Sequence, residues 1–471
     1  MSTSIRREPP VPGPGQPVVF PPVTRVRLPN GFAVWFVERP QLPFVSVCLH
    51  VPAGSAIDPI DLPGVAAFTA DMLDEGAAGR SAIEIQEALG RLGATLETEA
   101  GFDAVVLAFS VLPHHARDAC DLIAELVMRP TLAAADFDRV KTLRLNRLRQ
   151  LRDSPAAVAD QGFVQTVFGA HPYGHQPWGL TQAIERMRVE DVARIHEEAY
   201  RPEACALMVV GALAPAEVVQ MAESAFGAWT GAEMRSDLIS PDAASPVEPP
   251  ETKLGPTSFP APSSPRILLV DRPGAAQTEL RIGHVAVGRR TPDYHPLVLL
   301  NAILGGQFVS RINLNLREQK GYTYGAHTAF DFRRLAGAFV LQTSVQSDAT
   351  ADAIGESIRE IAAIRSDRPP DADEIDFGRA TLTRGYARNF ETTGQMARAL
   401  TQLVMHDLPD DTFDRFVPGI NAVQAGELTV AAGQHLRPEE LVVVAVGDRT
   451  TFESDLSALG LGTPAVVTVE I

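Results

Sequence analysis

The chain has 471 residues, of which 45% are hydrophobic, and it carries a formal net charge of −17 at pH 7. No apolar stretch approaches the ~20 residues that span a bilayer, so we expect a soluble protein and no membrane partner. The negative net charge argues against nucleic acid and anionic membranes as binding partners, because both repel a negative surface. An acidic surface is also compatible with a basic peptide substrate, but such charge more often serves only solubility.

Two stretches rich in proline divide the sequence. Residues 1–21 lack the apolar core of a signal peptide and are expected to be an extended leader. This start fits a cytoplasmic protein or a periplasmic one whose leader was removed. Residues 231–265 are dense in Pro and Ser without apolar periodicity, which predicts a linker. The remaining ranges, 22–230 and 266–471, are each predicted to form one domain.

The two predicted domains carry the same order of patterns, which indicates an internal repeat. Each has Val- and Leu-rich strands, an apolar helix, a strand followed by an amphipathic helix, and a closing β-rich run. For example, AVVLAFSVLPHHARDACDLIAELV in the first domain corresponds to AFVLQTSVQSDATADAIGESIREIA in the second. Because strands and helices do not alternate strictly, we expect an α+β fold of two homologous α/β sandwiches with mixed sheets.

The helix predicted in the first domain has the sequence LPGVAAFTADMLDE, residues 62–75. Residues 64–76 resemble the M16 (pitrilysin, inverzincin) pattern G-L-A-H-F-L-E-H-M-L-F-x-G, in which two His bind zinc and the Glu activates water. The three key positions hold Ala67, Ala70 and Asp71. Alanine has no lone pair to donate and one carboxylate cannot hold catalytic zinc, so we expect this chain to bind no metal.

The resemblance to M16B-type peptidases covers residues 24 to about 459. In the first domain it includes HPYGHQPWGLTQAIERMRVEDVARIHEEAYRP, and in the second DRPGAAQ and LNAILGGQFVSRINLNLREQKGYTYG. It implies that the third zinc ligand of the family, a Glu, falls at Asn146 or Arg147, and neither completes a zinc site.

Substitute metal ligands are hard to find elsewhere in the sequence. His171 and His175 are four residues apart, but the intervening Pro172 and Gly174 oppose a regular helical face. The remaining histidines are isolated or adjacent, and the three cysteines form no C-x-x-C pair.

A second set of family residues is retained. Arg317 and Tyr324 lie seven residues apart in LREQKGYTY. The resemblance implies that this pair binds the substrate backbone and stabilises the oxyanion at the scissile carbonyl, chemistry that suits a guanidinium and a phenol. Tyr322 is a second candidate for the phenol. Gly305-Gly306 resembles the glycine-rich turn of the family. The pair is either part of a substrate-sensing loop or a plain helix end, and the sequence leaves both interpretations open.

The segment from Glu97 to Ala100 lies where active relatives have an edge strand that pairs with extended substrate. Strand addition would bind peptides through main-chain hydrogen bonds. Glu97 and Glu99 would project from one face, where they either favour basic peptides or protect the sheet edge from aggregation; we favour the second.

These observations lead to one hypothesis and two rivals. The first is the non-zinc subunit of a heterodimeric M16B peptidase, forming half of a clamshell and inactive alone. Its partner would carry H-x-x-E-H and zinc, and the substrate would be a peptide. The second is a structural protein like the M16-related core subunits of respiratory complexes. The third, a metallopeptidase with relocated ligands, has little support from the histidines.

Overall fold

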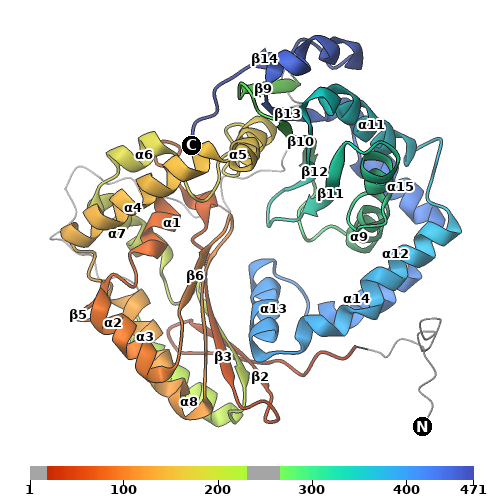
Figure 1. Cartoon of the computed structure of the whole chain (residues 1–471). Coiled ribbons are helices and arrows are strands. Elements are labelled where there is room, and N and C mark those ends of the chain that lie inside the picture. Colours follow the sequence, from red (N-terminus) through yellow and green to blue (C-terminus); the bar gives the residue numbers. More distant parts are fainter. Residues whose placement is uncertain (1–17, 231–265) are drawn as a thin grey trace, which may run out of the picture.

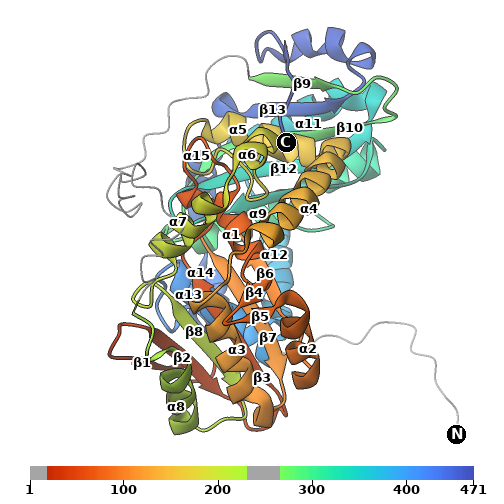
Figure 2. The same ribbon diagram turned by 90° about the vertical axis from the view of Figure 1, so that its left-hand side faces the viewer.

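The structure is a computed structural model that describes residues 18–230 and 266–471. The predicted linker, residues 231–265, and most of the predicted leader lie outside the described residues, and the domain boundaries stay predictions. The described part contains two six-stranded sheets packed by helices (Figure 1), which confirms the predicted α+β fold. Figure 2 shows the same arrangement from the side.

The first half builds one six-stranded sheet, a small two-stranded sheet of β4 and β5, and the helices around them. Its strands are β1 (Thr24–Arg27), β2 (Ala33–Glu38), β3 (Val45–Val51), β4 (Gly76–Ala77), β5 (Arg80–Ser81), β6 (Glu97–Ala100), β7 (Val105–Val111) and β8 (Ala206–Gly211). Its helices are α1 (Val65–Asp71), α2 (Ala82–Leu92), α3 (Ala116–Met128), α4 (Ala134–Asp153), α5 (Pro155–Phe168), α6 (Thr181–Arg186), α7 (Val189–Ala199) and α8 (Pro215–Phe226).

The second half builds the other sheet. Its strands are β9 (Ile267–Asp271), β10 (Gln277–Ala286), β11 (Thr323–Asp331), β12 (Gly337–Gln346), β13 (Val442–Gly447) and β14 (Ala465–Val466). Its helices are α9 (Tyr294–Leu304), α10 (Arg311–Asn313), α11 (Thr350–Ala363), α12 (Ala372–Arg384), α13 (Thr393–Met405), α14 (Thr412–Ala422) and α15 (Ala425–His435). A π-helix, η4 (Leu314–Gln319), follows α10.

Five strands of each sheet share one topology, which confirms the predicted repeat, and the sixth strands, β1 and β14, pair in opposite senses. The strand orders of the two sheets are β6-β7-β3-β8-β2-β1 and β11-β12-β10-β13-β9-β14. In both, the first four strands pair antiparallel and the fifth pairs parallel with the fourth. The edge strands β6 and β11 therefore hold equivalent places.

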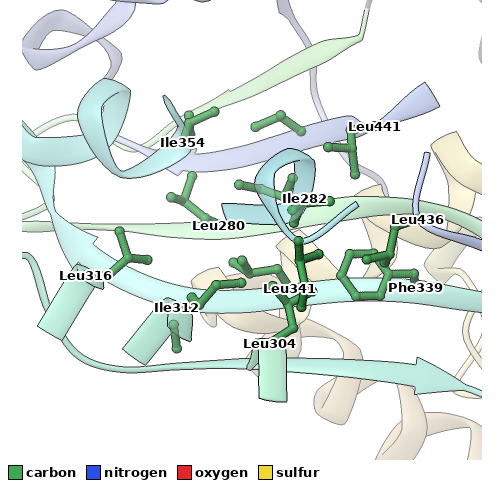
Figure 3. Packing of buried hydrophobic residues seen from close by; sticks show 14 of the residues in the cluster. Leu280, Ile282, Leu304, Ile312, Leu316, Phe339, Leu341, Ile354, Leu436 and Leu441 are labelled. Atoms are coloured by element: carbon green, nitrogen blue, oxygen red, sulfur yellow. The ribbon is translucent and has the colours of Figure 1, made fainter. Parts of the chain in front are cut away.

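One face of the second sheet packs against helices of its own half. Leu280 and Ile282 of β10 and Leu341 of β12 contact a cluster that includes Leu304 of α9 and Ile354 of α11 (Figure 3). These residues alternate along the strands because successive side chains point to opposite faces. The first sheet packs in the same way against α3 and α8.

The other face of each sheet is covered by a helix from the opposite half. Leu400 of α13 packs with Cys48 of β3 and Met208 of β8, in the first sheet. Phe163 of α5 packs with Val444 of β13, in the second sheet. Figure 1 shows α5 against β13 and β10, and α13 beside β3. Burial on both faces explains why β3, β8 and β13 are buried at every position.

Replacing Leu400 with Ala should test this exchange of helices. Leu400 is fully buried between the halves, so we expect the free energy of unfolding to fall by about 2–5 kcal/mol. Chemical denaturation would measure the change. Val430→Ala, at a position on α15 that is 56% exposed, is the control. A loss as small as that of the control would contradict the packing described above.

Two buried histidines meet where the halves join. His50 lies on β3 and His406 caps the C-terminus of α13. Burial is the main cause that lowers the pKa of His50 to about 4, with added repulsion from Arg334 and His406. Burial likewise lowers the pKa of His406 to about 4, although Asp103 opposes the shift. The Nδ1 atom of each ring has no hydrogen-bond partner among the described residues. Both rings are therefore neutral in the folded protein near pH 7.

Acidification should weaken the fold through these rings. A histidine whose pKa is lower in the folded state takes up its proton more readily when unfolded, so stability falls as the pH drops below about 6.5 toward 4. Each ring should cost about 2 kcal/mol between pH 7.5 and pH 5. Denaturation at both pH values should show that His406→Asn flattens this dependence. The exposed His114→Asn should leave it unchanged, and an equally steep dependence in His406→Asn would refute the assignment.

Candidate functional site

Helix α1 occupies the place of the zinc helix, and its start is fixed by a tight approach. Gly64 has φ +99°, and a Cβ there would lie 2.6 Å from the Cα of Gly179, so only glycine fits this backbone. The Asp58 carboxylate accepts hydrogen bonds from the backbone N–H groups of Gly64 (2.6 Å) and Ala66 (2.8 Å). His175 Nε2 lies 2.9 Å from the same carboxylate. This histidine therefore supports the helix start.

Of the three positions that correspond to the zinc motif, one forms an ion pair and two are buried alanines. Ala67 and Ala70 are buried in the core. The carboxylate of Asp71 accepts hydrogen bonds from Arg144 Nη2 (2.6 Å) and Nε (3.1 Å), and Arg144 is only 12% exposed. A guanidinium on α4 thus faces α1 where a third ligand would be needed.

The predicted third ligand position, Asn146 or Arg147, lies on α4. Asn146 and Arg147 are both exposed, and the residue of α4 that contacts Asp71 is Arg144. Spacing along the sequence does not show which face of α4 is turned toward α1. That orientation decides which side chain of α4 points at α1. In the described parts of the chain no group of three or more His, Cys, Asp or Glu could hold a metal ion. The residues present at α1 do not fit zinc.

Removal of metal should therefore leave the isolated chain unaffected. We expect EDTA to leave its melting temperature unchanged, because an ion pair and not a metal joins α1 to α4. Asp71→Asn should lower the free energy of unfolding by about 0.5–1 kcal/mol, the range of partly exposed pairs. Asp61→Asn, an exposed carboxylate nearby, is the control. Destabilisation by EDTA, or zinc bound in a one-to-one ratio, would contradict this account.

The retained pair lies at the edge of the second sheet. Arg317 is part of η4, and Tyr324 is part of β11. The guanidinium carbon of Arg317 lies 3.9 Å from the ring centroid of Phe308. Its Nη1 is 3.4 Å from the Glu318 carboxylate but makes no hydrogen bond with any described residue. Tyr324 is 91% exposed.

A β-bulge turns Tyr324 outward. The pairing of β11 with β12 shifts between Thr323 and Ala326, and such bulges redirect side chains at sheet edges. The buried Asn313 fixes the bulge: its Oδ1 accepts from the N–H of Ala326 (2.8 Å), and its Nδ2 donates to the carbonyl of Ala326 (2.6 Å). Nδ2 also lies 3.2 Å from the carbonyl of Gln307, which joins the bulge to the turn that carries Phe308.

Tyr322 is placed differently from Tyr324. It packs against the core of the second half, and its hydroxyl donates to Asp352 of α11 (3.4 Å). Burial, followed by the charge of Asp352, raises the pKa of this phenol. Tyr322 therefore faces its own domain, and Tyr324 is the phenol that faces solvent.

Glu97 and Ala100 lie on the other edge strand, β6. Glu97 and Glu99 both pair with Arg398 of α13, the helix exchanged from the second half. Ala100 packs against the core of the first half. The structure thus brings Arg317 and Tyr324 to one sheet edge and places Glu97 and Ala100 at another.

The glycine pair ends α9. A Cβ at Gly305 would lie 2.5 Å from the Oγ1 of Thr328, and one at Gly306 would lie 2.5 Å from the side-chain nitrogen of Asn301. Close packing at a helix end therefore accounts for both glycines. Beyond them a cavity of about 510 Å³ opens along β11 and β12, lined by Gly306, Phe308, Asn313, His327, Gln342 and Ser344, among others.

The comparisons agree with this arrangement. Residues 33–176 match the family described as Insulinase (Peptidase family M16), and residues 186–382 match the one described as Peptidase M16 inactive domain. The chain belongs to the M16 peptidase family. This confirms the resemblance drawn from the motifs.

Individual relatives are distant but cover most of the chain. An uncharacterized zinc protease of Mycobacterium leprae is 25% identical over 78% of this chain and 79% of its own length. One from Bacillus subtilis is 19% identical over 88% of this chain and 95% of its own length. A crystal structure titled as a peptidase M16 inactive domain from Pseudomonas fluorescens has a TM-score of 0.79 at 24% identity, covering 90% of this chain and 98% of that one.

The solved relatives support the fold alone at this level of identity. Among the described residues, no helix is both long and apolar enough to cross a membrane.

Sequence reasoning missed Arg144 and Asn313. Asn313 carries no pattern of its own, and Arg144 belongs to a run of arginines in which no single residue stands out.

Proposed function

We propose that this chain is the zinc-free subunit of a two-chain M16 peptidase. The partner would carry H-x-x-E-H, and its zinc and glutamate would activate water. This chain would supply Arg317, Tyr324 and part of the chamber wall. The proposal is carried by one observation: Tyr324 is 91% exposed on a bulge that Asn313 holds in place.

The chemistry of the pair suits peptide hydrolysis. Attack on a peptide carbonyl places negative charge on its oxygen, and donors already aimed at that oxygen lower the barrier. The phenol of Tyr324 can donate one hydrogen bond. The guanidinium of Arg317 carries one buried donor, Nη1, that has no hydrogen-bond acceptor among the described residues and lies 3.4 Å from the Glu318 carboxylate. Use of this donor by a substrate would require a shift of its surroundings when the partner or the substrate binds. Stacking on Phe308 holds the guanidinium without occupying this donor.

The contrast with Arg144 supports a structural role for Arg144 and a substrate-binding role for Arg317. Arg144 donates two hydrogen bonds to Asp71 and lies largely buried, so it is committed to the fold. Within residues 18–230 and 266–471, the Arg317 guanidinium contacts a neighbouring glutamate at 3.4 Å and an aromatic ring. Arg144 is thus bound to a carboxylate by two hydrogen bonds, whereas Nη1 of Arg317 has no hydrogen-bond acceptor among the described residues.

Substitution in the assembled enzyme tests this role. With a partner subunit that carries H-x-x-E-H, Arg317→Ala should lower kcat/KM by about 10²–10³, the usual cost of a lost oxyanion donor, and leave the zinc content unchanged. Tyr324→Phe should lower it as well. Arg91→Ala, an exposed arginine of the first half, is the control.

The outcomes separate the candidate functions. Unchanged turnover in both Arg317→Ala and Tyr324→Phe would refute the catalytic role and favour a structural one. A larger loss in Tyr322→Phe than in Tyr324→Phe would assign the phenol to Tyr322. Capture from the source cell's extract should yield a partner of similar size with an intact H-x-x-E-H. Self-association alone would count against the pairing.

A further inference from the structure

The segment that carries Arg317 has an uncommon backbone. Residues Leu314–Gln319 form a π-helix, and the N–H of Lys320 donates to the carbonyl of Asn315 at 3.0 Å, five residues back. A π-turn is rare and often marks a functional site. Its geometry has to be held by surrounding contacts, because the competing α-helical pairing uses one residue fewer per turn.

Helix α11 provides such contacts from one face. Asp352, Glu356 and Glu360 are spaced four residues apart along α11, and this spacing places them in a row, which we call the acidic stripe. All three reach the segment between residues 315 and 322. Asp352 accepts from the Tyr322 hydroxyl (3.4 Å), and Glu360 accepts from Asn315 Nδ2 (2.8 Å).

Glu356, the middle member of the stripe, contacts both ends of the π-turn. Its Oε2 accepts from Asn315 Nδ2 at 3.1 Å, and its Oε1 lies 2.9 Å from the ammonium of Lys320. Asn315 is the second residue of the π-helix and Lys320 directly follows it. One carboxylate therefore spans the turn, while Arg317 lies between the two attachment points.

The surroundings keep Glu356 charged and ordered. The side chain is 13% exposed, and Arg359 approaches its Oε1 to 2.6 Å. Burial opposes ionisation, but hydrogen bonds from Lys320 and Asn315 outweigh it and lower the pKa of Glu356. The charge is thus available near pH 7 to hold the turn.

Apolar packing holds the same segment from another side. Leu316 and Ile312 belong to the core cluster that contains Ile354 of α11 (Figure 3). This packing holds one face of the segment, and the polar contacts of Asn315 and Lys320 with Glu356 hold another. A change from π to α winding would shift the register by one residue, or about 100° around the helix. Arg317 would then leave the ring of Phe308.

We propose that Glu356 is a positioning residue: by holding both ends of the π-turn it directs Arg317 toward the edge of β11. This inference rests on the proposed function, because Arg317 is the group through which Glu356 acts. The acidic stripe then helps to orient the proposed oxyanion donor Arg317 before the substrate binds.

A double-mutant cycle in the assembled enzyme tests the inference. Glu356→Ala should lower kcat about tenfold and change KM less than threefold. In an Arg317→Ala background the same substitution should have no further effect, because the residue it positions is gone. Glu356→Gln, which keeps the acceptor for Asn315 but not the charge for Lys320, should fall between wild type and Glu356→Ala. Glu439→Ala, which removes an exposed glutamate paired with Arg365, should leave kcat unchanged.

Hydrogen exchange on the isolated chain gives a readout that does not need the partner. In Glu356→Ala, amides between residues 315 and 322 should exchange faster, and those of β10 and β13 should not. Unchanged exchange in this segment would overturn the inference.

The two proposals fail in different ways. If Arg317→Ala does not affect turnover, the proposed function fails and the positioning role fails with it. If Arg317→Ala lowers turnover but Glu356→Ala costs the same factor with and without Arg317, only the positioning role is overturned.

Discussion

The exchange of helices between the two halves is the constraint on which the rest of the structure depends. Helix α5 of the first half covers β10 and β13, and α13 of the second half covers β3 and β8. Neither sheet can bury its central strands with its own helices alone. The exchange joins the halves, and it leaves edge strands such as β6 and β11 more exposed than the central strands β3, β8 and β13. The candidate site is built on one of these edges.

Two arginines show how the equivalent halves diverged. Arg144 faces α1 and is neutralised by Asp71, so an ion pair lies at a position that the M16 pattern gives to a zinc ligand. Arg317 lies on η4, beside the edge of the other sheet, with an aromatic ring under its guanidinium and a donor without an acceptor among the described residues. The first arrangement joins α1 to α4, and the second is the one that we propose to act on substrate. The proposed function therefore rests on residues of the second half.

Much of the fold could be predicted from the sequence, because the apolar patterns of the two halves repeat in the same order. Segments such as residues 105–111 and 337–346 are strands with matching positions in the two sheets. The loss of the zinc ligands could also be predicted, since a side chain without a donor cannot bind metal in any fold. The exchange of α5 and α13 could not, because periodicity shows which face of a helix is apolar but not which sheet that face meets.

The details of the candidate site depend on three-dimensional contacts in the same way. The spacing of Asp352, Glu356 and Glu360 was visible in the sequence, but it matches any exposed acidic helix face. The π-turn and the bulge beneath Tyr324 leave no compositional signal. Asn315 and Asn313, which join these elements to their surroundings, resemble ordinary polar residues until their partners are known.

Titration of this chain against a purified M16 subunit that carries H-x-x-E-H tests the central claim most directly. Peptidase activity and zinc content should be measured at each mixing ratio. The account predicts little activity in either chain alone, and activity that rises until the two are present in equal amounts, with one zinc per pair. Full activity of the partner alone, unaffected by added chain, would contradict it.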